Sequence, residues 1–193
     1  VHAEGDFVGL AGIDLSTGES GTGMASLREA GSALARMAPA EIMVSQWPEG
    51  SSALAVAVRG ASVPFADLHR QSPIGSEQAD LFGQAYGSDW QAALQGFSPL
   101  EMTALGALLA YVHRSVGQLP VRLAPPRRAV MGDTMEIDAP TLRGLEVFTS
   151  VSGCNGALMS VLDRTVTPAG RRLLARQLSA PLTRPTRLER RPA

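Results

Sequence analysis

The chain has 193 residues, 45% of them hydrophobic, and a formal net charge of −1. This length suffices for one ordinary domain with a smaller unit appended. No apolar run approaches the roughly 20 residues that cross a bilayer, and no basic-then-apolar leader is present, so we expect a soluble, cytoplasmic protein without a membrane partner. The single cysteine, Cys154, excludes an intramolecular disulfide and is interpreted as a small packed residue.

The net charge hides an uneven distribution along the chain. Residues 1–114 hold 5 arginines against 12 acidic residues, or −7, whereas residues 115–193 hold 12 arginines against 6, or +6. Such asymmetry is typical of a basic part with an acidic partner, nucleic acid included. No aromatic residues that could stack on bases are interleaved with these arginines, which favours solvated faces instead.

The N-terminal pattern predicts a hairpin followed by a helix. Residues 7–15 and 19–25 flank Ser16-Thr17-Gly18, where glycine suits a tight turn. Leu27, Ala30, Leu34 and Met37 then fall on one helical face, and Pro39 ends the run.

Short apolar runs follow at residues 41–45 and 54–58, and both are typical of strands. Residues 78–86 return to helical spacing. Strands interleaved with helices predict an α/β fold with a layered sheet.

A capping box marks the longest predicted helix. In Ser98-Pro99-Leu-Glu101, serine is the N-cap, proline suits the first turn, and the helix continues to Val116. The segment Gly117-Gln-Leu-Pro120 breaks it, residues 119–137 are extended or looping, and the pattern is helical thereafter. We therefore place a domain boundary near Gly117, giving domains 1–116 and 117–193.

A second strong helix signal lies near the C-terminus. Thr167 is a good N-cap and Pro168 suits the first helical position, and the helix runs until Pro181. Its apolar face holds Leu173, Leu174 and Leu178, and its opposite face holds Arg171, Arg172 and Arg176. These three arginines are the candidate contacts to phosphate or to an acidic partner.

Four blocks in order resemble the MutS family of bacterial DNA mismatch recognition proteins. They are Val8-Gly-Leu-Ala-Gly-Ile-Asp-Leu-Ser-Thr-Gly-Glu19, Ala104-Leu-Gly-Ala-Leu-Leu-Ala-Tyr-Val112, Met135-Glu-Ile-Asp-Ala-Pro-Thr-Leu-Arg-Gly-Leu-Glu146 and Leu162-Asp-Arg-Thr-Val-Thr-Pro-Ala-Gly-Arg-Arg-Leu-Leu174. The chain departs from the family at Pro140, Gly144, Ala169 and Gln177, where Ala, Asn, Met and Trp are usual. Pro140 costs little if Asp138 or Ala139 is the cap of its helix.

The resemblance implies an RNase H-like, mixed-sheet connector domain followed by the mainly α-helical start of a core domain. In the family this region links mismatch recognition to an ATPase. It also implies partners for the parent protein: the remaining MutS domains, DNA, MutL and a second MutS subunit. ATP and Mg²⁺ are implied as cofactors of the parent.

The motifs of the parent's activities are absent from this sequence. No Gly-x-x-x-x-Gly-Lys-Ser/Thr occurs, and the chain has no lysine at all. Phe7-Val-Gly lacks the carboxylate of the mismatch-reading Phe-x-Glu motif. We therefore expect a fragment without enzymatic activity, and without catalytic, cofactor or metal residues of its own. We also expect residues after Thr149 to be loosely held, because the apolar faces of Leu158, Leu162, Leu173 and Leu178 lack partners.

Two alternatives from other classes remain open at this point. An RNase H-like nuclease would use Asp14 on the first strand with further carboxylates that hold two metal ions. No spacing in the sequence brings such carboxylates together, so a structural role for Asp14 is favoured. The basic second part could instead act as a stand-alone nucleic-acid-binding module with salt-sensitive affinity.

Overall fold

The computed structural model describes residues 1–37, 39–48, 50, 53–61, 63–68, 76–117, 123–128, 134–135, 137–150 and 156–189. Cys154 and the segment 118–120 after the long helix lie outside the described residues, as does much of the predicted loop 119–137.

Three consecutive strands form an antiparallel meander, β1 (His2–Glu4), β2 (Phe7–Asp14) and β3 (Glu19–Ser26). The β2–β3 hairpin is the one that the sequence predicts. Its register pairs Asp14 with Glu19 beside the turn. Gly18 in that turn has φ +73°, a left-handed conformation that glycine adopts without steric cost.

Parallel strands extend the meander and make the sheet mixed. β4 (Ile42–Val44) and β5 (Phe65–Asp67) pair in parallel, and a parallel bridge between His2 and Gln46 joins them to β1. The two-residue β6 (Arg127–Arg128) runs parallel to β3 at the other edge. The predicted α/β class with a mixed sheet is confirmed.

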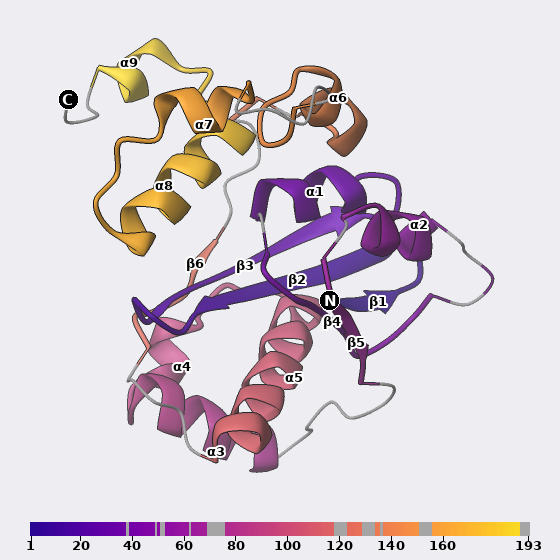
Figure 1. The fold of residues 1–193 in the computed structure, drawn as a ribbon. Helices are drawn as coiled ribbons and strands as arrows, with labels where there is room; N and C mark the ends of the chain where they lie inside the picture. Colours follow the sequence, from indigo (N-terminus) through magenta and orange to yellow (C-terminus); the bar gives the residue numbers. More distant parts are fainter. Residues whose placement is uncertain are drawn as a thin grey trace.

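Helices cover both faces of this sheet (Figure 1). One face carries α1 (Ala30–Met37) and α2 (Ala53–Gly60). The other carries α3 (Ser76–Tyr86), α4 (Trp90–Ala93) and α5 (Pro99–Val116).

Strand β2 contributes to two apolar cores because its side chains alternate in direction. Val8 and Leu10 are buried in the core under α1 and α2. Ala11 and Ile13 point the other way and pack against the core formed with α3 and α5. The described residues within 1–117 thus fold around this strand, and we call this part of the chain the sheet unit.

The expected strand at 54–58 is wrong, because these residues belong to helix α2. Leu54 and Val58 are four residues apart, lie on one helical face and are fully buried against the sheet. Val56 between them is exposed on the opposite side. A short apolar run fits a helix and a strand equally well, and the tertiary packing decided for the helix.

The two ends of α5 follow the sequence prediction. The Ser98 hydroxyl accepts a hydrogen bond from the Glu101 amide at 3.3 Å, and the Glu101 carboxylate accepts one from the Ser98 amide at 2.9 Å. At the other end, Gly117 takes φ +80° and its amide donates to the His113 carbonyl, which terminates the helix.

The C-terminal helices lie together beside α1 (Figure 1). They are α6 (Ala139–Gly144), α7 (Leu158–Leu162), α8 (Pro168–Ser179) and α9 (Pro185–Leu188). Asp138 caps α6 through the Thr141 amide at 2.7 Å, so Pro140 lies in the first turn. Thr167 caps α8 through the Gly170 amide at 3.1 Å, as predicted.

The apolar faces of these helices are partly exposed to solvent and partly packed against other residues. Leu158, Leu162 and Leu173 are exposed, in agreement with the expectation that they lack partners. Leu178 differs, because it packs against a small core of Ile137, Leu142 and Val147. Within the described residues, no helix combines the length and apolar character needed to cross a bilayer.

Candidate functional site

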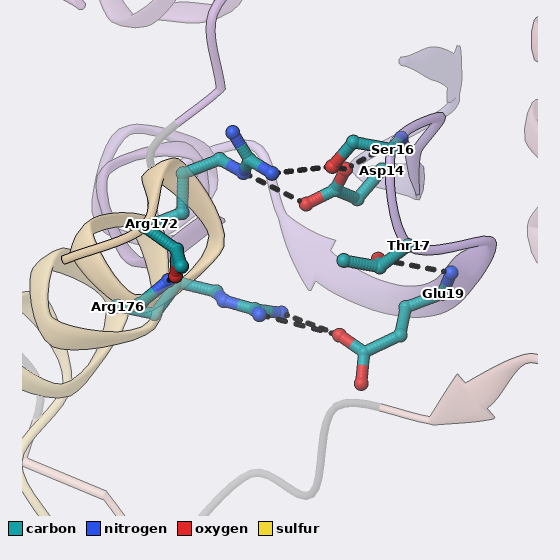
Figure 2. A network of polar contacts seen from close by, with 8 residues as sticks. Asp14, Ser16, Thr17, Glu19, Arg172 and Arg176 are labelled. Atoms are coloured by element: carbon teal, nitrogen blue, oxygen red, sulfur yellow. Dashed lines mark hydrogen bonds and ion pairs between the residues drawn. The ribbon is translucent and has the colours of Figure 1, made fainter.

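Two arginines of α8 reach across to the turn of the β2–β3 hairpin, 156 to 158 residues away in sequence (Figure 2). Arg172 Nε donates to Asp14 Oδ2 at 3.0 Å, and its Nη2 also donates to the Ser16 hydroxyl. This contact joins the C-terminal helices directly to the sheet unit.

Asp14 is held in place by its own turn as well as by Arg172. Its Oδ1 accepts hydrogen bonds from the Ser16 amide at 2.9 Å and the Ser16 hydroxyl at 2.6 Å. These bonds from Ser16, together with the charge of Arg172, keep the pKa of Asp14 below its ordinary value of 3.8. The hairpin therefore presents a fixed carboxylate to α8.

A second ion pair lies one helical turn along. Arg176 Nη1 and Nη2 both donate to Glu19 Oε2, at 3.3 and 3.2 Å. The two side chains are 43% and 48% exposed. At such exposure an ion pair contributes roughly 0–1 kcal/mol to stability, and salt screens it.

Arg171, the third predicted arginine, does not reach the hairpin. Its Nε lies 3.4 Å from Asp163 Oδ2, within the C-terminal helices. Asp163 also accepts hydrogen bonds from the Thr165 hydroxyl and amide, and these lower its pKa. The structure thus places all three arginines in ion pairs inside the chain and brings only Arg172 and Arg176 together on the sheet unit.

The other end of α8 is buried against α1. Ser179 is completely buried, and its hydroxyl lies 3.3 Å from the Arg36 carbonyl and 3.1 Å from the Arg176 carbonyl. Leu178 packs on the same cluster as Ala35 of α1. Ser179 is thus shielded from water and Leu178 is partly buried, in contrast to the exposed ion pairs at the hairpin.

A further ion pair, which sequence reasoning missed, ties β6 to the start of α5. Arg128 Nε and Nη2 lie 3.2 and 3.0 Å from the two oxygens of Glu101, and the guanidinium lies over the Phe97 ring, 4.8 Å from its centroid. The sequence assigns Glu101 only to the capping box. Arg128 follows two prolines in a segment without periodicity, so no local pattern marks its partner.

The nuclease alternative is not favoured. Asp14 is engaged by Arg172 and Ser16, and in the described part of the chain no three acidic, His or Cys side chains are grouped so that they could hold a metal ion. The stand-alone nucleic-acid-binding alternative is not favoured either, since the candidate arginines are paired with carboxylates of the chain itself.

Comparison with known proteins identifies the region. A family model described as MutS domain II matches residues 1–118, and one described as MutS domain III matches residues 140–193. The chain is 38% identical over 176 residues to the DNA mismatch repair protein MutS of Azorhizobium caulinodans, covering 90% of this chain and 19% of that protein. It is 39% identical over 192 residues to MutS of a Bradyrhizobium species, covering 97% of this chain and 20% of that protein.

A third relative, MutS of Cereibacter sphaeroides, is 36% identical over 185 residues, which is 91% of this chain and 20% of that protein. The chain therefore spans about a fifth of the length of the relatives it matches. Because the domain II match alone covers more than half of the residues, the chain belongs to the MutS family of DNA mismatch repair proteins.

Proposed function

We propose that this chain is the segment of a mismatch repair protein that links the mismatch-reading part to the ATPase part. The observation that carries this proposal is the junction between the sheet unit and α8. One chain segment matched to domain II and another matched to domain III meet there through Arg172–Asp14, Arg176–Glu19 and the buried Ser179. A linking segment needs such a defined contact between its two parts, and it needs no catalytic group.

We further propose that residues 1–116 form an RNase H-like connector domain and that residues 117–193 begin the core domain. The mixed sheet supports this fold: a three-stranded meander continues through β4 and β5, which run parallel to β1, and helices cover both faces. The left-handed cap at Gly117 supports the boundary.

DNA, MutL, the remaining MutS domains and a second subunit are proposed as partners of the whole protein, in the cytoplasm. ATP and Mg²⁺ are proposed as its cofactors, bound elsewhere in the protein. The residues of this chain do not fit a nucleotide phosphate site, because the sequence contains neither a phosphate-binding loop nor a lysine. Titrating the purified chain with ATP and Mg²⁺ in a calorimeter is expected to give no saturable heat.

A chimera tests the linking role. This chain replaces the matching segment of the Azorhizobium caulinodans MutS, and the chimera is expressed in a MutS-deficient host. We expect the mutation frequency to return close to the level obtained with the unmodified relative. Deletion of the segment is the negative control. A chimera that is stably expressed but leaves the mutation frequency at the level of the deletion contradicts the proposal.

A further inference from the structure

Helix α8 is attached to the sheet unit by two different kinds of contact. At its C-terminal end, Ser179 and Leu178 are packed against α1 and the cluster around Leu142. Nearer its N-terminal end, Arg172 and Arg176, which lie seven and three residues before Ser179, meet the hairpin through ion pairs in which both guanidinium side chains are more than 40% exposed. The first kind of contact involves no charged group, so salt does not screen it, whereas salt screens the second.

Both partners of the ionic contact are organised independently of it. The hairpin turn is closed by hydrogen bonds from Ser16 to Asp14 Oδ1 and by the amides of Thr17 and Gly18 on the Asp14 carbonyl. Arg172 uses the other carboxylate oxygen, Oδ2. Helix α8 has its own cap at Thr167. Separation of the two surfaces therefore leaves the turn and the helix intact, as a two-state contact requires.

We propose that Arg172 and Arg176 with Asp14 and Glu19 form a releasable electrostatic latch, and that α8 pivots about its buried Ser179 end when the latch opens. The latch deepens the linking role and rests on it, because it supplies a way in which the two parts change their relative orientation. Low ionic strength closes the latch, and screening of the two ion pairs opens it.

The charge pattern on α8 makes the proposal specific to two positions. Arg171 and Arg172 are exposed neighbours on the same helix with the same charge, yet Arg171 pairs with Asp163, which precedes α8. Reversal of the charge at Arg172 breaks the latch, whereas reversal at Arg171 leaves both latch pairs in place. The two variants are matched in net charge and in helix propensity.

The experiment measures the distance between the sheet unit and α8 in the full 193-residue chain. Spin labels are attached at Q95C, on the exposed end of the α4 segment, and at L173C, on the exposed face of α8, in a C154S background. Pulsed electron spin resonance records the distance distribution at about 0.05 M and about 1 M NaCl, where the Debye length falls from about 14 Å to about 3 Å.

We expect one narrow distance at low salt and a broader distribution with a second population at high salt. Arg172→Glu and Arg176→Glu should each shift the closed-to-open ratio about two- to fivefold at low salt, the range of an exposed ion pair, and Arg171→Glu should not. The exchanged pair Glu19→Arg with Arg176→Glu should restore the narrow distance. Circular dichroism of each variant checks that the fold is retained.

A distribution that is the same at both salt concentrations overturns the latch, and this measurement needs no variant. An equal effect of Arg171→Glu and Arg172→Glu also overturns it. The repair test of the chimera can fail independently of the distance measurement. If the chimera repairs mismatches but the distance in the 193-residue chain does not respond to salt, the latch is removed and the linking role stands. If the distance in the 193-residue chain responds to salt but the chimera cannot repair, the contact between the two parts opens and closes while the linking role is removed.

Discussion

Glu101 is 3% exposed, and its carboxylate receives both Nε and Nη2 of Arg128 as well as the Thr22 hydroxyl at 3.2 Å. The same carboxylate closes the capping box with Ser98. One buried side chain therefore connects β3, β6 and the first turn of α5.

Loss of the cation from this pair should destabilise the sheet unit. Arg128→Ala leaves a buried carboxylate with neutral donors only, and we expect the free energy of unfolding to fall by about 1–3 kcal/mol, less than for a fully buried pair because Arg128 is 49% exposed. Urea denaturation measures this. The neighbouring Arg127, exposed on the same strand, is the matched control, and Arg127→Ala should change stability by less than about 0.5 kcal/mol. Equal losses in the two variants would show that the pair with Glu101 is not the cause.

A fall in pH should reduce the stability that the Glu101 carboxylate contributes. Burial alone would raise the pKa of Glu101, but hydrogen bonds from Ser98 and Arg128 outweigh it and keep the pKa below its ordinary value of 4.5. The unfolded chain therefore binds the proton more tightly, so this stabilisation is complete above pH 4.5 and is lost as the pH falls through the folded-state pKa.

We expect Glu101→Gln to be less stable than the parent at pH 7, and to lose less stability between pH 5 and pH 3. Urea titrations across that range measure the free energy of unfolding of each protein as a function of pH, and the two slopes are compared. Asp14, whose pKa is also lowered, contributes the same trend to both proteins. Parallel pH profiles for the two proteins would refute the assignment.

Replacement by alanine should have opposite effects on stability at two glycines. A Cβ at Gly9 would lie 2.3 Å from the Leu100 carbonyl oxygen, and since neither atom can move without its own backbone, strand β2 and helix α5 would have to separate. We expect Gly9→Ala to cost about 1–3 kcal/mol or to prevent folding. Gly144 at the end of α6 has open space around it, so Gly144→Ala should be neutral or stabilise by up to about 1 kcal/mol. Thermal unfolding compares them, and a tolerated Gly9→Ala would contradict the close approach.

The isolated chain should not distinguish mismatched from paired DNA. Discrimination requires a group that enters the duplex and unstacks a base step. Trp47 packs edge-on against Phe65 and Trp90 packs against Phe82, so these rings are engaged within the fold. Arginine contacts to phosphate, including any by Arg171, Arg172 or Arg176, carry no sequence information.

Titration of labelled duplexes with and without one G·T pair, at low and physiological salt, measures this. Any binding should be uniform and should weaken as salt rises. A preference of about tenfold for the mismatch, or ~1.4 kcal/mol, that survives physiological salt would overturn the prediction.

Local signals in the sequence were sufficient for the elements whose ends are marked chemically. The turn at Gly18, the capping box at Ser98 and the Thr167-Pro168 start of α8 each depend on residues within four positions of one another. The strand assigned to residues 54–58 failed because a five-residue apolar run has no such marker. β1 and β5 also escaped prediction, because each has only three residues, too few to show an alternating pattern. In addition, β5 pairs with β4, which lies 23 residues earlier in the sequence.

For the candidate site, too, some features could be predicted from the sequence and others could not. The sequence by itself determined the family, the amphipathic character of α8 and the arginines on its polar face, because these depend on residue type and helical period. Only the tertiary structure decided where those arginines go: Arg172 and Arg176 to hairpin carboxylates more than 150 residues away, and Arg171 to Asp163 nearby. An ion pair depends on the distance between charges, and that distance is set by how α8 packs on α1, which no local pattern encodes.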